Sequence, residues 1–140
     1  MAVHVLAVLA YKQGDPVSSA KLAASVNTNP VIIRRLILSL QRARLVETHK
    51  GAGAGSHLSR SPGSINLAQV YRAVEDAEPF ASPARKANTA CPVGHCIQKT
   101  LTRVFTSAEA ALERDLEKTT LANVMDTIKA ECRCGSRKAG

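Results

Sequence analysis

Arg34 and Arg35 are the residues of this 140-residue sequence whose type and place most clearly indicate chemistry. They lie early in an apolar segment that follows Asn27-Thr28-Asn29-Pro30, a pattern typical of a helix start. Guanidinium groups near the N-terminal end of a helix can read guanine bidentately or bind a backbone phosphate. These two arginines therefore predict contact with a polyanion.

The charge of the chain is distributed unevenly, and this favours the same partner. The formal net charge is +8. Residues 1–60 hold eight Lys and Arg against two acids, a net charge of +6, whereas residues 61–140 hold eleven against nine, a net charge of +2. A basic front half favours double-stranded DNA as partner. A solvated surface tuned for solubility is the alternative interpretation of the same composition.

The cysteines form two close pairs, Cys91 with Cys96 and Cys132 with Cys134. The first apolar run ends at Lys12, short of the about 20 residues of a membrane span, and it resembles no secretory signal. We therefore expect a cytoplasmic protein with no membrane partner. In that reducing compartment, cysteine clusters sense redox state or bind metal more often than they form disulfides.

Cys91 and Cys96 are predicted to be redox-sensing thiols. If Cys91 caps the helix that Pro92 begins, the positive end of that helix lowers the pKa of its thiol and favours the thiolate. The alternatives are an inert cap with a small core residue, or a metal centre. Neither pair matches the ligand spacing of zinc or an iron–sulfur cluster, so no metal site and no cofactor is predicted. Cys132 and Cys134 are expected to be exposed, inert thiols.

Residues 1–77 have the element order of a winged helix-turn-helix. Helical spacing of apolar residues predicts a helix over 1–12, a second one starting at Ser18 or Ser19, and a third from the Asn29-Pro30 step to about Arg44. Strands are expected at 45–50 and 57–60 around a glycine-rich turn at 51–55, and a fourth helix is expected to begin at Ser64. The fold class is mainly α with a small β-hairpin wing.

In this arrangement the third helix enters the major groove and the hairpin lies beside it as a wing. Hydroxyl and N–H groups at the start of the second helix would face a phosphate, and the hairpin glycines let the backbone approach DNA closely. A plain flexible hairpin is the alternative for those glycines. The residues expected to contact DNA are Ser18, Ser19, Thr28, Asn29, Val31, Arg34, Arg35, Lys50, His57 and Arg60.

The back half predicts a linker over 78–91, dimerisation helices over 92–131 and a flexible basic tail over 132–140. In the long helix after Pro92, apolar residues recur every three or four positions and form a narrow stripe that suits one partner helix. They are Ile97, Leu101, Val104, Phe105, Ala108, Leu112 and Leu116. The acids at 109–117 are expected to pair with Arg114 and Lys118 on a solvated face.

Several stretches of the sequence resemble one family. They are Val31 to Ile37, Leu45-Val46, Lys50-Gly51 with Gly53 and Gly55, Ile65-Asn66-Leu67, and Tyr71-Arg72-Ala73-Val74-Glu75. Over most of the chain they are similar to the Rrf2 family of winged-helix bacterial transcription regulators. The stretch from Cys91 to His95 looks like a subgroup without the cysteine triad of cluster-binding members. The resemblance implies a homodimer on a roughly palindromic operator, with the helix after Pro92 as the dimer element.

Three features depart from that family pattern. The first helix begins several residues later than in the family and is expected to be shortened. Arg44 stands where a glycine normally closes the third helix, so a different turn geometry is expected there. Ala54 and Ser56 replace a glycine and an aromatic residue of the wing, so different wing contacts are expected.

The sequence therefore predicts a sequence-specific DNA-binding transcriptional regulator, a homodimeric repressor modulated by thiol oxidation. An iron–sulfur-sensing regulator and a winged-helix protein-interaction adaptor remain alternatives. An enzyme is not expected, and no catalytic residue is predicted. The four histidines are scattered and the acids cluster only on helices.

Overall fold

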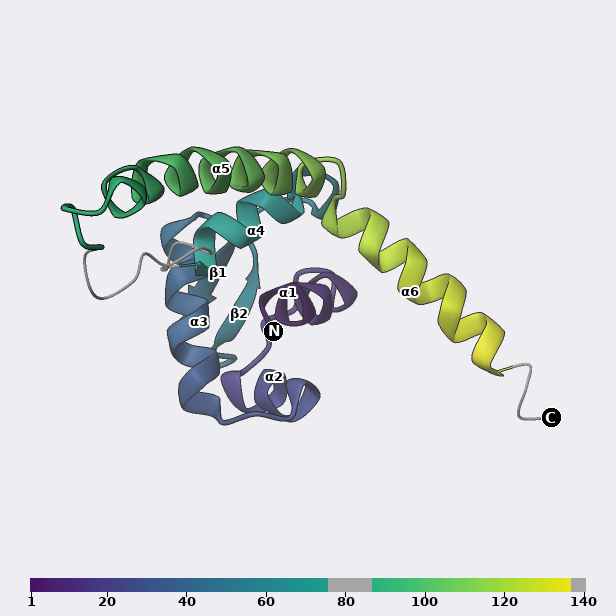
Figure 1. Ribbon diagram of the computed structural model, residues 1–140. Helices are drawn as coiled ribbons and strands as arrows, with labels where there is room; N and C mark the ends of the chain where they lie inside the picture. Colours follow the sequence, from purple (N-terminus) through teal and green to yellow (C-terminus); the bar gives the residue numbers. More distant parts are fainter. Residues whose placement is uncertain (76–86, 137–140) are drawn as a thin grey trace.

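The computed structural model describes residues 1–75 and 87–136, so most of the linker predicted at 78–91 lies outside the described residues. Figure 1 shows three helices around a two-stranded hairpin, α5 running across this head above α4, and α6 leading away from it. In chain order the elements are α1 (Ala2–Tyr11), α2 (Ser19–Val26), α3 (Pro30–Arg42), β1 (Val46–His49), β2 (Gly55–Leu58), the 3₁₀ turn η1 (Pro62–Ser64), α4 (Leu67–Val74), α5 (Pro92–Leu116) and α6 (Leu121–Ser136). The predicted fold class is confirmed.

The core is aliphatic and joins every element of the head. Leu6 of α1, Leu22 of α2 and Ile33 of α3 are fully buried, and Ile37 and Leu40 complete the inner face of α3. Two residues from the helices predicted for dimerisation, Leu121 and Met125 of α6, belong to the same core. Among residues 1–75 and 87–136, no helix combines the length and the hydropathy that a membrane crossing requires.

Helix α3 ends at Arg42, two residues before the predicted end, and Arg44 supplies the backbone geometry that a glycine normally provides. Arg44 has a φ of 56°, in the left-handed region. Its N–H donates to the Gln41 carbonyl at 2.9 Å, and the Leu45 N–H donates to the Leu40 carbonyl at 2.9 Å. These two bonds form a Schellman closure, which an arginine holds at a steric cost of about 1 kcal/mol. The turn therefore keeps its geometry without the glycine.

The hairpin differs from its predicted position, because β2 begins at Gly55 and ends at Leu58, two residues earlier than expected. Its register pairs Val46 with Leu58 and His49 with Gly55. Ser56 also pairs with Val17 in the α1–α2 connection, through two backbone hydrogen bonds of 2.9 Å. A Cβ on Gly55 would lie 2.8 Å from the backbone of Val17. This glycine therefore admits a third segment of the chain beside the hairpin.

We expect Gly55→Ala to lower the free energy of unfolding by about 2 kcal/mol, because the backbone of Pro16 and Val17 cannot yield to the added methyl group. Urea denaturation followed by circular dichroism measures this change. Gly63→Ala is the matched control, since a Cβ there meets nothing within 4 Å, and it should change stability by less than about 0.5 kcal/mol. Equal stability of the two variants would contradict the close approach at Gly55.

Helix α4 begins at Leu67 and not at Ser64, because Asn66 caps it. The Asn66 side chain accepts a hydrogen bond from the Gln69 N–H at 2.9 Å, and the Gln69 side chain accepts one from the Asn66 N–H at 3.2 Å. The segment before the cap pairs with the start of α6: the Leu121 N–H donates to the Ile65 carbonyl at 2.8 Å. This pairing fixes the start of α6 to the head.

Helix α6 reaches Ser136, so the tail predicted to begin at residue 132 is helical for its first five residues. Residues 137–140 lie outside the described part of the chain.

Candidate nucleic-acid interface

Helix α3 presents a cationic outer face at the edge of the head. The Asn29 side chain caps the helix by accepting a hydrogen bond from the Val31 N–H at 2.8 Å, and Pro30 occupies the first turn. Arg34 and Arg35 are exposed, as predicted, while the opposite face packs against α2, α4 and β1. The helix is therefore held by its apolar side and leaves its N-terminal half open to a ligand.

Two of the predicted contact residues around α2, Ser18 and Thr28, make hydrogen bonds within the protein. The Ser18 hydroxyl caps α2 by accepting a hydrogen bond from the Lys21 N–H at 3.3 Å, and Ser19 is the first helical residue. The Thr28 N–H donates to the Ala23 carbonyl at 3.0 Å and closes α2, with Asn27 in the left-handed region. All three predicted residues here are half-buried, and they lie at the two ends of α2.

The predicted contact residues of the wing, which is formed by β1, β2 and the turn between them, differ in how exposed they are. Lys50 at the turn and Arg60 after β2 are exposed. The His57 side chain is 17% exposed, and its ring stacks on His49 with the centroids 4.7 Å apart. Its Nε2 lies 3.6 Å from a Glu47 carboxylate oxygen. Lys50 and Arg60 are thus available to a ligand, whereas His57 is engaged in the hairpin.

An ion cluster joins α4 to α5 in a way that the sequence did not indicate. Arg72 donates two hydrogen bonds to one carboxylate oxygen of Glu113, at 3.0 and 2.6 Å, and one to Glu117 at 3.0 Å. The expected pairing of these acids with Arg114 is wrong, since the Arg114 Nε donates to the Ala110 carbonyl. The expected Lys118 pairing is confirmed, with Asp115 at 3.1 Å. Glu113 and Glu117, four residues apart, share one face of α5, but this spacing does not identify Arg72 as their partner.

The hydrogen bonds from Arg72 lower the pKa of the Glu113 carboxyl below its ordinary value. The Arg72–Glu113 interaction therefore stabilises the fold fully above the ordinary glutamate pKa and is lost as the pH falls through the lowered one. We expect Glu113→Gln to be less stable than the unmodified protein at neutral pH, with a difference that shrinks on acidification. Denaturation midpoints across acidic pH test this.

Glu131→Gln is the control for that experiment, because Glu131 is exposed on α6 without an ion pair among the described residues. Its stability should follow that of the unmodified protein at every pH. A Glu113→Gln difference that stays constant from neutral to acidic pH would rule out the ionic origin of the effect.

Cys91 is the N-cap of α5, as the sequence predicts, and its side chain is exposed. Its thiol makes no capping hydrogen bond with the first turn of α5. The backbone N–H groups of Gly94 and Val93 nevertheless lower the pKa of the Cys91 thiol. Cys96 is exposed one turn further along, and Cys132 is exposed on α6. The Cys91 thiol is therefore more readily deprotonated than an ordinary cysteine thiol.

The described side chains do not fit an iron or iron–sulfur centre. Among them, no group of three or more His, Cys, Asp and Glu lies close enough to hold a metal ion. Cys91 and Cys96 share the first turns of α5 without a third ligand beside them in the part of the chain that the structure describes.

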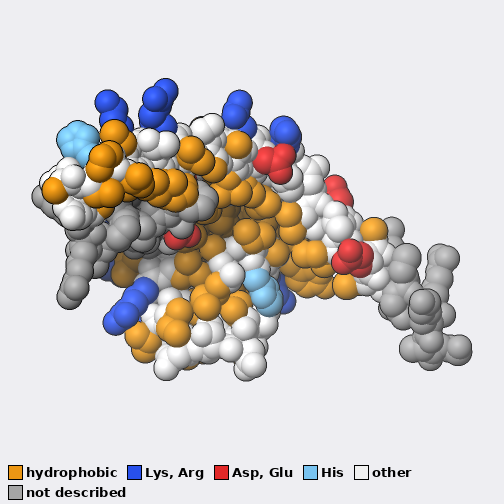
Figure 2. Space-filling model, in the orientation of Figure 1, with side chains coloured by type: hydrophobic (Ala, Val, Ile, Leu, Met, Phe, Trp, Pro, Cys, Tyr) orange, Lys and Arg blue, Asp and Glu red, His pale blue; other side chains and the backbone are white. Residues whose placement is uncertain are grey.

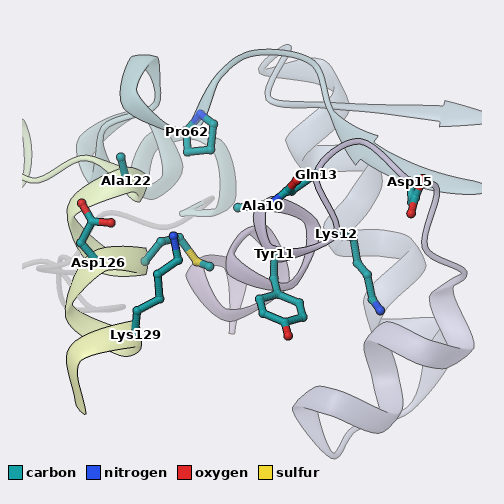
Figure 3. A pocket seen from close by; sticks show the side chains of 10 residues that line it. Ala10, Tyr11, Lys12, Gln13, Asp15, Pro62, Ala122, Asp126 and Lys129 are labelled. Carbon is teal, nitrogen blue, oxygen red and sulfur yellow. The ribbon is translucent and has the colours of Figure 1, made fainter. Parts of the chain in front are cut away.

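A groove of 680 Å³ lies between the C-terminal end of α1 and the side of α6. Figure 3 shows Asp126 and Lys129 on the α6 side of this groove, with Tyr11 and Lys12 on the α1 side. Both walls carry an acid and a base, since Asp15 also lines the α1 side. The groove therefore has no excess of either charge and is no extension of the cationic face.

Helix α5 carries apolar side chains that the other described parts of the chain leave exposed. None of its residues, all of which the structure describes, is buried. The exposed apolar residues along it are Val93, Ile97, Leu101, Val104 and Leu112. Figure 2 shows hydrophobic side chains gathered along α5 toward the start of α6. Ile97, Leu101, Val104 and Leu112 belong to the stripe that the sequence predicts for a partner helix, whereas Phe105 and Leu116 of that stripe are half-buried.

Comparison with known proteins gives this geometry a family context. The model of the Rrf2 family, described as iron-dependent transcriptional regulators, matches residues 1–127. YwnA of Bacillus subtilis, which carries the name of an HTH-type transcriptional regulator, is 36% identical over 128 residues, covering 91% of this chain and 94% of YwnA.

Two solved structures are also similar. One, described as a DNA-binding protein, is 37% identical with a TM-score of 0.70, and the match covers 89% of this chain and 95% of that one. A transcriptional regulator from Lactobacillus plantarum, 22% identical, has the same fold with a TM-score of 0.76, over 99% of this chain and 95% of that one.

Proposed function

This chain belongs to the Rrf2 family of transcriptional regulators, and we propose that it is a homodimeric, sequence-specific DNA-binding repressor. The observation that carries the proposal is the exposed cationic face of α3, held from behind by the core. Two such faces on a two-fold dimer would read the two halves of a palindromic operator.

The uncovered apolar stripe of α5 supports the dimer. Leu101 and Val104 are 39% and 57% exposed, although they follow the spacing of a helix–helix seam. Packing α5 against its copy would remove this apolar surface from water and fix the separation of the two α3 helices. The Arg72 cluster, which holds α4 against α5, would transmit that separation to the head.

Fluorescence anisotropy with a duplex that covers the upstream region of its own gene tests DNA binding. We expect the affinity to fall steeply as salt is added, with a logarithmic slope that reflects several neutralised phosphates. A competitor duplex of unrelated sequence should displace the probe poorly. Absence of any affinity at low ionic strength would refute the proposal and favour a protein-binding role for the winged helix.

Repression is proposed because a dimer seated on an operator within a promoter blocks RNA polymerase sterically. A bacterial regulator of this kind acts in the cytoplasm, where its DNA lies. Transcription of a template carrying the upstream region should decrease when the protein is added. An increase would assign it as an activator.

We further propose that oxidation of Cys91 changes DNA affinity. The thiolate attacks one oxygen of hydrogen peroxide, forms a sulfenic acid and releases hydroxide; condensation with the Cys96 thiol then gives a disulfide and water. The lowered pKa of Cys91 supports this reactivity, and its place at the start of α5 couples it to the proposed dimer helix.

Peroxide should therefore weaken operator binding several-fold in the unmodified protein and leave Cys91→Ser unaffected. Because the thiolate reacts, the oxidation rate should rise with pH until the lowered pKa of Cys91 is passed. Cys132→Ser is the control and should respond like the unmodified protein. Equal responses of Cys91→Ser and the unmodified protein would eliminate the thiol switch.

A further inference from the structure

Two exposed apolar residues lie in the middle of the cationic face of α3. With 100° between successive residues of a helix, Val31, Arg35, Leu38 and Arg42 form one row opposite the buried Ile33, Ile37 and Leu40. Val31 is 48% exposed and Leu38 is 55% exposed, and they alternate with the two arginines. The row therefore combines charge with apolar contact surface.

Single exposed apolar residues are ordinary on protein surfaces and need no explanation by themselves. Here both lie on the face that the proposed function turns toward DNA, at the spacing at which recognition helices present their reading side chains. The edges of base pairs in the major groove offer one apolar group, the C5-methyl of thymine. A valine or leucine on a reading face therefore has one matching base.

The distance between the two residues gives the spacing of their targets. Seven residues of α-helix span about 10.5 Å. When the helix lies along the groove, this corresponds to roughly three base-pair steps of 3.4 Å. Arg35, between them on the row, would meet a phosphate or a guanine at an intermediate position.

We propose that Val31 and Leu38 are specificity-determining residues that contact the methyl groups of two thymines, about three base pairs apart, in each half of the operator. The inference rests on the proposed DNA-binding function and adds to it which base the apolar positions of α3 select.

The test uses the duplex that the full-length protein selects from a random-sequence pool. Each dT of a half-site is replaced in turn by dU, which removes the methyl group and keeps every hydrogen-bonding group. One methyl group withdrawn from water corresponds to about a fourfold change in affinity. With the unmodified protein, we expect dU to lower the affinity by this factor at two dT positions of the half-site.

Variants assign each methyl group to its residue. At one of the two methyl-sensitive dT positions, Val31→Ala should bind the dT and the dU duplex with equal affinity. At the other position, Leu38→Ala should show the same equality. Ile32→Ala is the matched control: Ile32 is 46% exposed but points about 100° away from Val31 around the helix, so both methyl effects should persist. Circular dichroism verifies that the three variants keep the fold.

Loss of methyl sensitivity in the Val31 and Leu38 variants, and its persistence in the Ile32 variant, supports the assignment. Full affinity of the unmodified protein for every dU duplex, or persistent methyl sensitivity in Val31→Ala and Leu38→Ala, overturns it while leaving DNA binding itself established. If no duplex is enriched from the pool, the proposed function fails, and this inference fails with it.

Discussion

Replacing Arg34 and Arg35 together by alanine should abolish specific DNA binding and leave the fold intact. Both side chains are exposed on α3, and the core behind them is unchanged by their loss. A dimer would lose four guanidinium groups. At about 1 kcal/mol for each contact, the lower end of the usual range, the affinity falls by roughly a thousandfold.

The measurement is a fluorescence anisotropy titration with the selected duplex at two salt concentrations. Lys99→Ala with Arg114→Ala is the matched control, since it removes the same charge from α5, outside the proposed interface. That control should bind the duplex nearly as tightly as the unmodified protein. In the Arg34 and Arg35 variant, the affinity should depend less steeply on salt concentration. Full affinity of the Arg34 and Arg35 variant would mean that another helix reads the DNA.

The second large effect is expected from charges in the apolar stripe of α5. Leu101→Glu with Val104→Glu places two carboxylates of each copy in the apolar stripe of the proposed dimer seam. Uncompensated charges of this kind cost several kcal/mol when buried, so the dissociation constant of the dimer should rise by roughly a thousandfold. The head keeps its core, because neither residue is buried in the monomer.

Sedimentation equilibrium of the variant should give the mass of one chain, and operator affinity should fall with it. Thr106→Glu provides the control, because Thr106 is exposed on α5 about 140° from Leu101 and about 160° from Val104 around the helix. It should remain a dimer. A dimeric Leu101 and Val104 variant would show that the copies associate through a different surface.

The sequence was sufficient for the parts of the fold that local chemistry decides. Asn29 followed by Pro30 specifies a helix start, and the spacing of Ile33, Ile37 and Leu40 specifies which side of α3 is buried. The Cys91-Pro92 step likewise places a helix start at the beginning of α5. In each case the determining interaction lies within one helical turn, so the residues that make it are neighbours in the sequence.

The features that the sequence did not reveal depend on partners far along the chain. The start of β2 is set by Val17, which pairs with Ser56 beside Gly55. Glu113 is held by Arg72, forty-one residues away, in place of the nearby Arg114. Residue type alone gives no signal for such pairs, because many acids and glycines offer the same choices.

The contribution of α6 to the head has a consequence for protein synthesis. Leu121 belongs to the core of the head, and its N–H donates a hydrogen bond to the Ile65 carbonyl. The amino-terminal part of the polypeptide therefore lacks these contacts when it first emerges from the ribosome. The ribosome must synthesise α5 and the start of α6 before the core of the head is complete. Chains abandoned midway should consequently lack the core contacts that α6 supplies to the head.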